Sequence, residues 1–255
     1  MNFFFHTSNT FLSSRLTIPK FQNSGKYHSN IFLFQADVID GCWSVSHADC
    51  DEDENFWMVE CNIRNKNSVY FLATNDEVKG CAPHNLLINF NSFTDTEPDY
   101  RANLEISNSK GASSSYQSEF PFAMTTKLGS LYSDCGMLTS SKADKVGVFL
   151  RNIHIKPIRK SAQLYLFDNN KNVLLETFEI FLNETCYVDL TKFKNYLTTC
   201  FIFVKDYIGI PIYVTQYTGG ALSFEHTHPP HELIQGKNRF LQVNKFKARA
   251  HEKIS

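Results

Sequence analysis

The sequence predicts a mostly β protein, an antiparallel β-sandwich or barrel with one helix at its C-terminal end. Short runs of β-branched and aromatic residues recur between turn-forming clusters, which is typical of strands. The 255 residues include 23 Phe and 11 Tyr, a content that favours strands over helical bundles. Helical periodicity is confined to the end of the chain. With 42% hydrophobic residues, the chain can bury a full core as one large domain or two β lobes.

The first half of the chain contains five predicted strands. They cover 31–34, 56–59, 69–72, 86–90 and 103–106. The segment 108–117, with Gly111 and four serines, predicts a loop or a connection between lobes. The predicted organisation is therefore an N-terminal extension (1–27), an N-terminal β lobe (28–116) and a C-terminal β-sandwich (117–255) that carries the terminal helix.

The second half of the chain contains five further strands and a hairpin. The strands are predicted at 146–155, 162–167, 173–182, 186–190 and 200–205. Leucines alternate with aromatic residues along 164–167, so both faces of this strand are expected to be buried. Gly219-Gly220 predicts a turn between 208–214 and 221–228, which makes these two segments the arms of a hairpin.

The terminal helix is predicted to be amphipathic. Phe240, Val243, Phe246 and Ala250 recur at helical spacing and are expected to pack on the β core. The opposite face is basic, with Lys237, Arg239, Lys245, Lys247, Arg249 and Lys253. Lys237 and Arg239 are the candidate substrate-binding residues, suited to a phosphate or a sugar-nucleotide. The alternative is a solvated terminal helix that binds nothing.

A histidine-rich segment at 225–232 is the densest group of metal-ligand types in the chain. It holds three of the nine histidines and two carboxylates. On a strand, His226 and His228 would lie on one side, about 6.5 Å apart along the chain. The two prolines at 229–230 would end the ladder and direct the following segment, with Glu232, back toward the same point.

These residues predict an open metal site. Two imidazoles and one carboxylate, from His226, His228 and Glu232, suit a divalent ion such as zinc or iron and leave positions for water or substrate. Glu225 or His231 is the candidate catalytic acid or base. The alternative interpretation is an exposed loop at a hairpin end that binds no ion.

Part of this segment resembles a known family. Gly220, followed by His226-Thr227-His228 and then Glu232, resembles the first metal-binding motif of the cupins. The resemblance implies a divalent ion on two histidines and one glutamate, lining a β-barrel or β-sandwich. The chain departs from the family after Glu232: Gly236 is at the wrong spacing and His251 is the only later histidine. The second cupin motif and its ligand are therefore missing.

A second resemblance concerns biological context. The stretches 118–122, 209–214 and 224–230 are similar to stretches of uncharacterised bacterial proteins associated with surface-polysaccharide sugar biosynthesis. The resemblance implies a role in carbohydrate metabolism and assigns no catalytic residue.

Charge and cysteine content narrow the expected partners and location. A formal net charge of -1 gives no electrostatic reason to expect nucleic acid as a partner. No stretch approaches the roughly 18 apolar residues of a membrane span. Seven cysteines at irregular spacing argue against a complete disulfide framework and predict a reducing, cytoplasmic location. The absence of acidic residues before Asp37 leaves an organellar targeting segment as the alternative. The acidic stretch 47–54 lacks the glycine of a calcium loop and predicts an acidic surface loop.

Two functional hypotheses follow. The first is a metal-dependent enzyme that acts on a sugar-like small molecule in surface-polysaccharide metabolism. The second is a non-catalytic β module that binds glycan or protein through the histidine-rich segment and its aromatic neighbours. The metal content of the protein distinguishes them.

Overall fold

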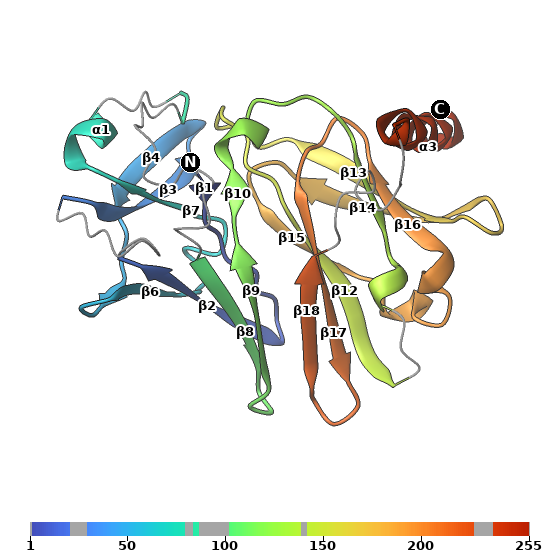
Figure 1. Ribbon diagram of the computed structural model, residues 1–255, viewed down its shortest axis with the longest axis horizontal. Helices are drawn as coiled ribbons and strands as arrows, with labels where there is room; N and C mark the ends of the chain where they lie inside the picture. The colour runs from blue at the N-terminus through green and yellow to red at the C-terminus, as the bar shows by residue number, and fades with distance from the viewer. Residues whose placement is uncertain are drawn as a thin grey trace. The chain divides into compact units, whose positions relative to one another are not determined.

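The computed structural model describes residues 2–20, 30–79, 84–86, 102–138, 142–226 and 237–254. These residues are mostly β, and every strand pair with a defined register is antiparallel, so the predicted fold class is confirmed at this level (Figure 1). The described strands form five sheets of two to five strands, rather than the two large sheets of a single sandwich. Among the described residues, the α-helices are the short α1 (Asn75–Lys79) and the predicted C-terminal helix, α3 (Arg239–Ile254). None of the helices in these ranges is long and apolar enough to cross a membrane.

The chain divides into two compact units. Unit 1 comprises Met1–Lys127, Arg151–Arg159 and Leu182–Thr185, whereas unit 2 comprises Leu128–Leu150, Lys160–Phe181 and Cys186–Ser255. Both units are therefore built from separate stretches of the chain. Two short segments from the second half of the sequence belong to unit 1.

Unit 1 contains a five-stranded sheet in the order β5-β6-β2-β8-β9, a three-stranded sheet in the order β4-β3-β7, and the pair β1-β10. The strands are β1 (Asn2–Phe3), β2 (Leu12–Pro19), β3 (Phe32–Ile39), β4 (Cys42–His47), β5 (Asp51–Glu52), β6 (Phe56–Glu60), β7 (Val69–Ala73), β8 (Ala102–Asn108), β9 (Ser113–Ser118) and β10 (Phe120–Pro121). A 3-10 turn, η1 (Phe122–Met124), follows. The strands predicted at 31–34, 56–59, 69–72 and 103–106 all coincide with strands of this unit.

The N-terminal segment supplies a central strand of unit 1. The sequence predicts an extension over 1–27, but within its described part β2 lies between β6 and β8. The reason is alternation: Leu12, Leu16 and Ile18 are buried, while Ser13 and Arg15 are exposed. The segment therefore has one apolar face that is buried in the sheet.

The serine-rich segment predicted as a loop at 108–117 is a hairpin instead. β8 and β9 pair in register, for example Ile106 with Ser114, and Gly111 turns the chain at φ 80°. Asn108 Oδ1 accepts the backbone N–H of Lys110 at 3.0 Å and of Ala112 at 3.2 Å, which fixes the turn. Because β9 is an edge strand with alternate residues exposed, serines are tolerated there. Of the strand predicted at 86–90, residues 87–90 lie outside the described residues.

The acidic stretch 47–54 lies at the surface, as predicted, but it is not entirely a loop, because Asp51–Glu52 form the short strand β5. β5 carries exposed acidic side chains, and Asp53 accepts the backbone N–H of Asn55 at 2.7 Å and of Phe56 at 2.8 Å. These two hydrogen bonds to Asp53 lower its pKa from the ordinary value. Its carboxylate is thus used to close the turn between β5 and β6.

Unit 2 contains two four-stranded sheets, in the orders β11-β16-β13-β14 and β15-β12-β17-β18. The strands are β11 (Leu131–Asp134), β12 (Ala143–Arg151), β13 (Ser161–Asp168), β14 (Val173–Phe181), β15 (Thr185–Asp189), β16 (Cys200–Val204), β17 (Ile210–Tyr217) and β18 (Leu222–His226). The short 3-10 turns are η2 (Gly136–Leu138), η3 (Thr191–Phe193) and η4 (Leu197–Thr199).

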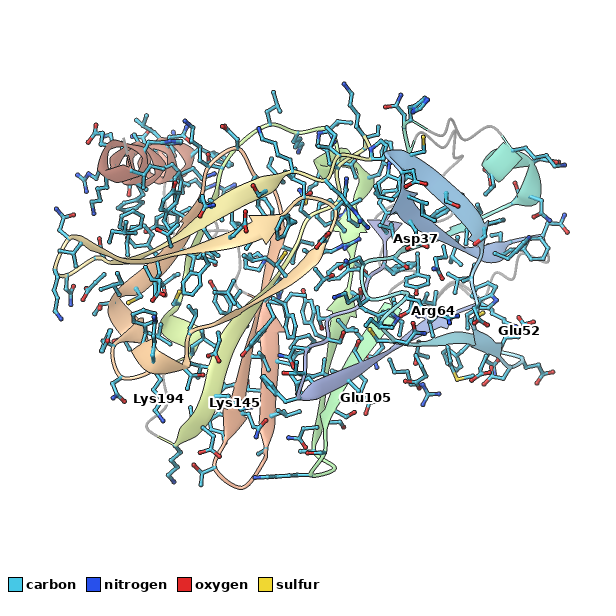
Figure 2. The ribbon with its side chains drawn as sticks, turned by 180° about the vertical axis from the view of Figure 1, so that it is seen from behind. Asp37, Glu52, Arg64, Glu105, Lys145 and Lys194 are labelled. Atoms are coloured by element: carbon cyan, nitrogen blue, oxygen red, sulfur yellow. The ribbon has the colours of Figure 1, made fainter. Side chains whose placement is uncertain are left out.

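The two sheets of unit 2 share one hydrophobic core. Val148 of β12, Leu166 of β13 and Ile202 of β16 are completely buried in the same cluster. Figure 2 shows side chains filling the space between these strands. Lys194, labelled there, donates from Nζ to the Ala143 carbonyl at 2.7 Å and so ties the segment after η3 to the start of β12.

Helix α3 covers the other face of the sheet that contains β13 and β16 (Figure 1). Phe167 of β13 is fully buried in the cluster that includes Ala250 of α3. Its neighbour Leu166 points into the core, so β13 is buried on both faces, as the sequence predicts. Phe246 stacks on Tyr132 at 5.9 Å between ring centroids. Phe240, expected on this apolar face, is instead 56% exposed because it lies in the first turn of the helix, beyond the packed cluster.

Candidate functional site

The hairpin that leads into the histidine-rich segment is present in unit 2. β17 and β18 pair antiparallel, with Val214 opposite Phe224 and Ile212 opposite His226. Gly219 and Gly220 both have positive φ, 96° and 101°, a conformation that glycine adopts without strain. The predicted turn and hairpin are thereby confirmed up to residue 226.

His226 is the last residue of β18. Side chains alternate along a strand, so His226 lies on the same face as Phe224. Phe224 is 4% exposed and meets Phe149 edge-on at 6.4 Å between ring centroids. The imidazole of His226 is therefore at the boundary of the core, with 31% of its side chain exposed, whereas Glu225 on the opposite face is 49% exposed.

Glu225 and His226 form a close pair. Glu225 Oε1 accepts the backbone N–H of His226 at 3.0 Å and lies 3.1 Å from its Nδ1. When Nδ1 carries the proton, it donates to this carboxylate, and Nε2 then carries the lone pair that a metal ion requires. The sequence does not predict this contact, because adjacent residues on a strand normally point to opposite faces.

The remaining metal and acid–base candidates, His228, His231 and Glu232, lie outside the described residues. Within the described ranges, no group of three or more His, Cys, Asp and Glu side chains is placed to hold a metal ion. The candidate substrate-binding residues Lys237 and Arg239 are exposed. The Arg239 guanidinium lies over the Phe240 ring, 5.1 Å from its centroid.

None of the cysteines that the structure describes forms a disulfide. Cys135 is completely buried in the core, with 0% of its surface accessible to solvent. Burial raises the pKa of the Cys135 thiol well above its ordinary value, and the nearby Cys200 adds to the shift. The thiol is thus protonated at neutral pH and is poorly suited to nucleophilic chemistry.

A second polar site lies elsewhere in unit 2. A cleft of about 370 Å³ is lined by Asn172, Arg249, Glu252 and Lys253. The sequence identifies the basic helix but not the contribution of Asn172, which comes from the β13–β14 turn. The available signal is the spacing of Arg249 and Lys253, which places two cations on one face of the helix.

Comparisons with known proteins give no relative for this chain. No protein-family model matches it, and no curated protein and no solved structure gives a significant match.

Proposed function

We propose that the protein binds a divalent metal ion, zinc or iron, at the end of β18, with His226, His228 and Glu232 as ligands. The observation that supports this proposal is the pairing of Glu225 with His226 Nδ1 at 3.1 Å. Histidines that bind metal ions usually donate their other ring N–H to a carboxylate, a carbonyl or water. Glu225 is therefore assigned an orienting role, and His231 is the candidate acid or base.

A site with two imidazoles and one carboxylate leaves coordination positions for water or substrate. When bound, such an ion would polarise a carbonyl or activate water on a sugar-like small molecule. The protein's own contribution is to hold His226 in one tautomer and one orientation through Glu225. In this proposal, the chain is a metal-dependent enzyme of carbohydrate metabolism.

Removing both histidines is expected to abolish metal binding. Protein purified without an affinity tag should contain about one zinc or iron per chain by elemental mass spectrometry, and the His226→Ala/His228→Ala variant should contain none, because two imidazoles supply most of the affinity. His84→Ala is the matched control, since His84 is exposed and belongs to unit 1. Unchanged metal content in the double variant would refute the assignment.

Replacing Glu225 tests the supporting observation separately. Glu225→Gln keeps the size of the side chain but removes the charge that favours the Nδ1–H tautomer, so metal affinity is expected to fall roughly 10- to 100-fold. Competition with a chelator of known affinity measures the change. Equal affinities for Glu225→Gln and the unmodified protein would show that the pair has no role in the site.

A metal-free protein that also fails to take up added ions would favour the other hypothesis, a non-catalytic β module that binds glycan or protein. The discriminating measurement is thus the metal content itself, because a recognition surface requires no ion.

A further inference from the structure

We propose that the cleft between α3 and the β13–β14 turn binds a small hydroxylated acid, a molecule with one phosphate or carboxylate beside hydroxyl groups. Its four lining residues are Asn172, Arg249, Glu252 and Lys253, and its volume of about 370 Å³ falls in the range of small-molecule sites. The site includes none of the residues near the end of β18. The proposal is therefore independent of metal binding.

The wall formed by the β13–β14 turn is held in place without a ligand. Asp168 is 2% exposed, and its Oδ1 accepts the backbone N–H of Asn170 at 3.0 Å and of Lys171 at 3.2 Å. The Thr199 hydroxyl donates to the same oxygen at 3.1 Å. Asn172 has φ 57°, a left-handed conformation that asparagine tolerates better than most residues. The turn thus presents Asn172 in a fixed backbone conformation.

The wall formed by α3 is also anchored. Ala250 is 1% exposed, and His251 meets the Phe203 ring edge-on at 4.9 Å between centroids. Lys253 Nζ lies 5.2 Å from the centroid of Phe167, within the range of a cation–π contact. These contacts fix the helix on the sheet, so a ligand would not have to order it. A preorganised site loses less entropy on binding.

The two cations of the cleft point to an anionic group. Arg249 and Lys253 are one helical turn apart, and like charges at this spacing repel each other. Neither forms an ion pair with a carboxylate in the described part of the chain. A phosphate or carboxylate between them would relieve the repulsion, and a guanidinium matches the geometry of both anions.

The other two residues define the rest of the ligand. The Glu252 carboxylate accepts hydrogen bonds from hydroxyl groups, and the Asn172 amide can both donate and accept. The same carboxylate would repel a second negative charge on the ligand. The cleft therefore suits a molecule with a single anionic group and several hydroxyls, rather than a polyanion.

Calorimetric titration of the full chain with four probes tests this proposal. Glucose 6-phosphate combines hydroxyl groups with a phosphate, and gluconate combines them with a carboxylate. Glucose carries the hydroxyl groups alone, and inorganic phosphate carries the anionic group alone. At least one hydroxylated acid is expected to bind roughly ten-fold more tightly than glucose and than phosphate. Its affinity is expected to fall as the salt concentration is raised. The proposal fails if neither acid binds, or if glucose or phosphate alone binds as tightly.

Variants locate the binding. Arg249→Gln and Lys253→Gln should each lower the affinity for the acid about ten-fold, because each removes a charged hydrogen bond. Lys245→Gln is the matched control, since Lys245 is an exposed lysine of α3 that does not line the cleft. Circular dichroism checks that the helix is retained. Equal affinity in the folded Arg249→Gln and Lys253→Gln variants would overturn the assignment, as would an equal loss in Lys245→Gln.

Discussion

Replacing Arg151 by methionine is expected to destabilise the protein by about 3 kcal/mol or more. Arg151 is completely buried, and its guanidinium donates to the Asn67 carbonyl at 3.0 Å and the Asn183 carbonyl at 3.4 Å. It also donates to Thr185 Oγ1 at 3.4 Å and lies 5.9 Å from the centroid of the Phe5 ring. Methionine fills similar space but leaves these buried and half-buried acceptors without their donor, and each unsatisfied buried group costs roughly 1–3 kcal/mol.

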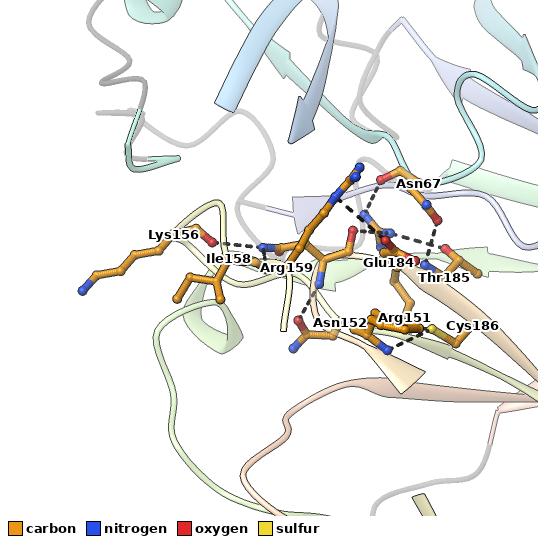
Figure 3. A network of polar contacts seen from close by, with 11 residues as sticks. Asn67, Arg151, Asn152, Lys156, Ile158, Arg159, Glu184, Thr185 and Cys186 are labelled. Atoms are coloured by element: carbon orange, nitrogen blue, oxygen red, sulfur yellow. Dashed lines mark hydrogen bonds and ion pairs between the residues drawn. The ribbon is translucent and has the colours of Figure 1, made fainter. Parts of the chain in front are cut away.

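The network around Arg151 connects all three sequence segments of unit 1 (Figure 3). Asn183 is 3% exposed, and its side chain accepts the His154 N–H at 2.7 Å and donates to the Lys156 and Ile158 carbonyls, each at 3.0 Å. The backbone N–H of Thr185 in turn donates to Asn67 Oδ1 at 3.1 Å. Loss of Arg151 therefore weakens a set of bonds that holds separate stretches of chain together.

Urea unfolding measures the change in the free energy of unfolding. Arg159→Met is the matched control: Arg159 is 59% exposed and pairs with Glu184 at 3.9 Å, a contact worth less than about 1 kcal/mol. If Arg151→Met is as stable as the unmodified protein, burying the charge costs as much as its hydrogen bonds return, and the network does not stabilise the fold.

Stability is expected to fall as the pH drops below 6.5, because of His6. This side chain is fully buried, with Nδ1 3.1 Å from Ser14 Oγ. Burial, and then the nearby Arg151 charge, lower the pKa of His6 to about 3. Between pH 6.5 and about 3, the unfolded chain binds a proton at this position and the folded protein does not. The contribution of His6 to the free energy of unfolding is thus fully present above pH 6.5. Below pH 6.5, the free energy of unfolding falls by about 1.4 kcal/mol for each pH unit.

Unfolding experiments between pH 7 and pH 4.5 measure this dependence. Across that range, His6 should remove about 3 kcal/mol. His6→Gln removes the titrating group, so its stability should change less steeply with pH, whatever its absolute stability. Carboxylates contribute at lower pH: Asp53, whose pKa is lowered from 3.8, loses its contribution only below that value. Parallel pH profiles for His6→Gln and the unmodified protein would rule out His6 as the source.

The strands that the sequence predicts correctly have regular apolar patterns. β6, β7 and β13 are short apolar runs, and α3 shows helical spacing of Val243, Phe246 and Ala250. The strand β2 escapes prediction because Ser14 interrupts its buried face. Ser14 is buried at 2% exposure because its hydroxyl contacts His6. That contact depends on tertiary structure, and no local pattern reveals it.

The candidate site is predictable in composition but not in geometry. The sequence places two carboxylates and three histidines in 225–232, and it predicts the hairpin that carries His226. It does not predict that Glu225 turns back to contact the next residue. The cleft at α3 depends on Asn172, which comes from the β13–β14 turn. The helical periodicity of α3 does not indicate which distant turn lies beside the helix.

The discontinuous make-up of unit 1 bears on the order of folding during synthesis. Met1–Lys127 emerge first, but the buried guanidinium at position 151 and the turn at Leu182–Thr185 belong to the same unit. On the ribosome, unit 1 cannot acquire its full set of buried hydrogen bonds until much of unit 2 has also been translated. Until then, some polar groups of the nascent N-terminal strands lack their native hydrogen-bond partners. During this period the incomplete unit would be most dependent on chaperones.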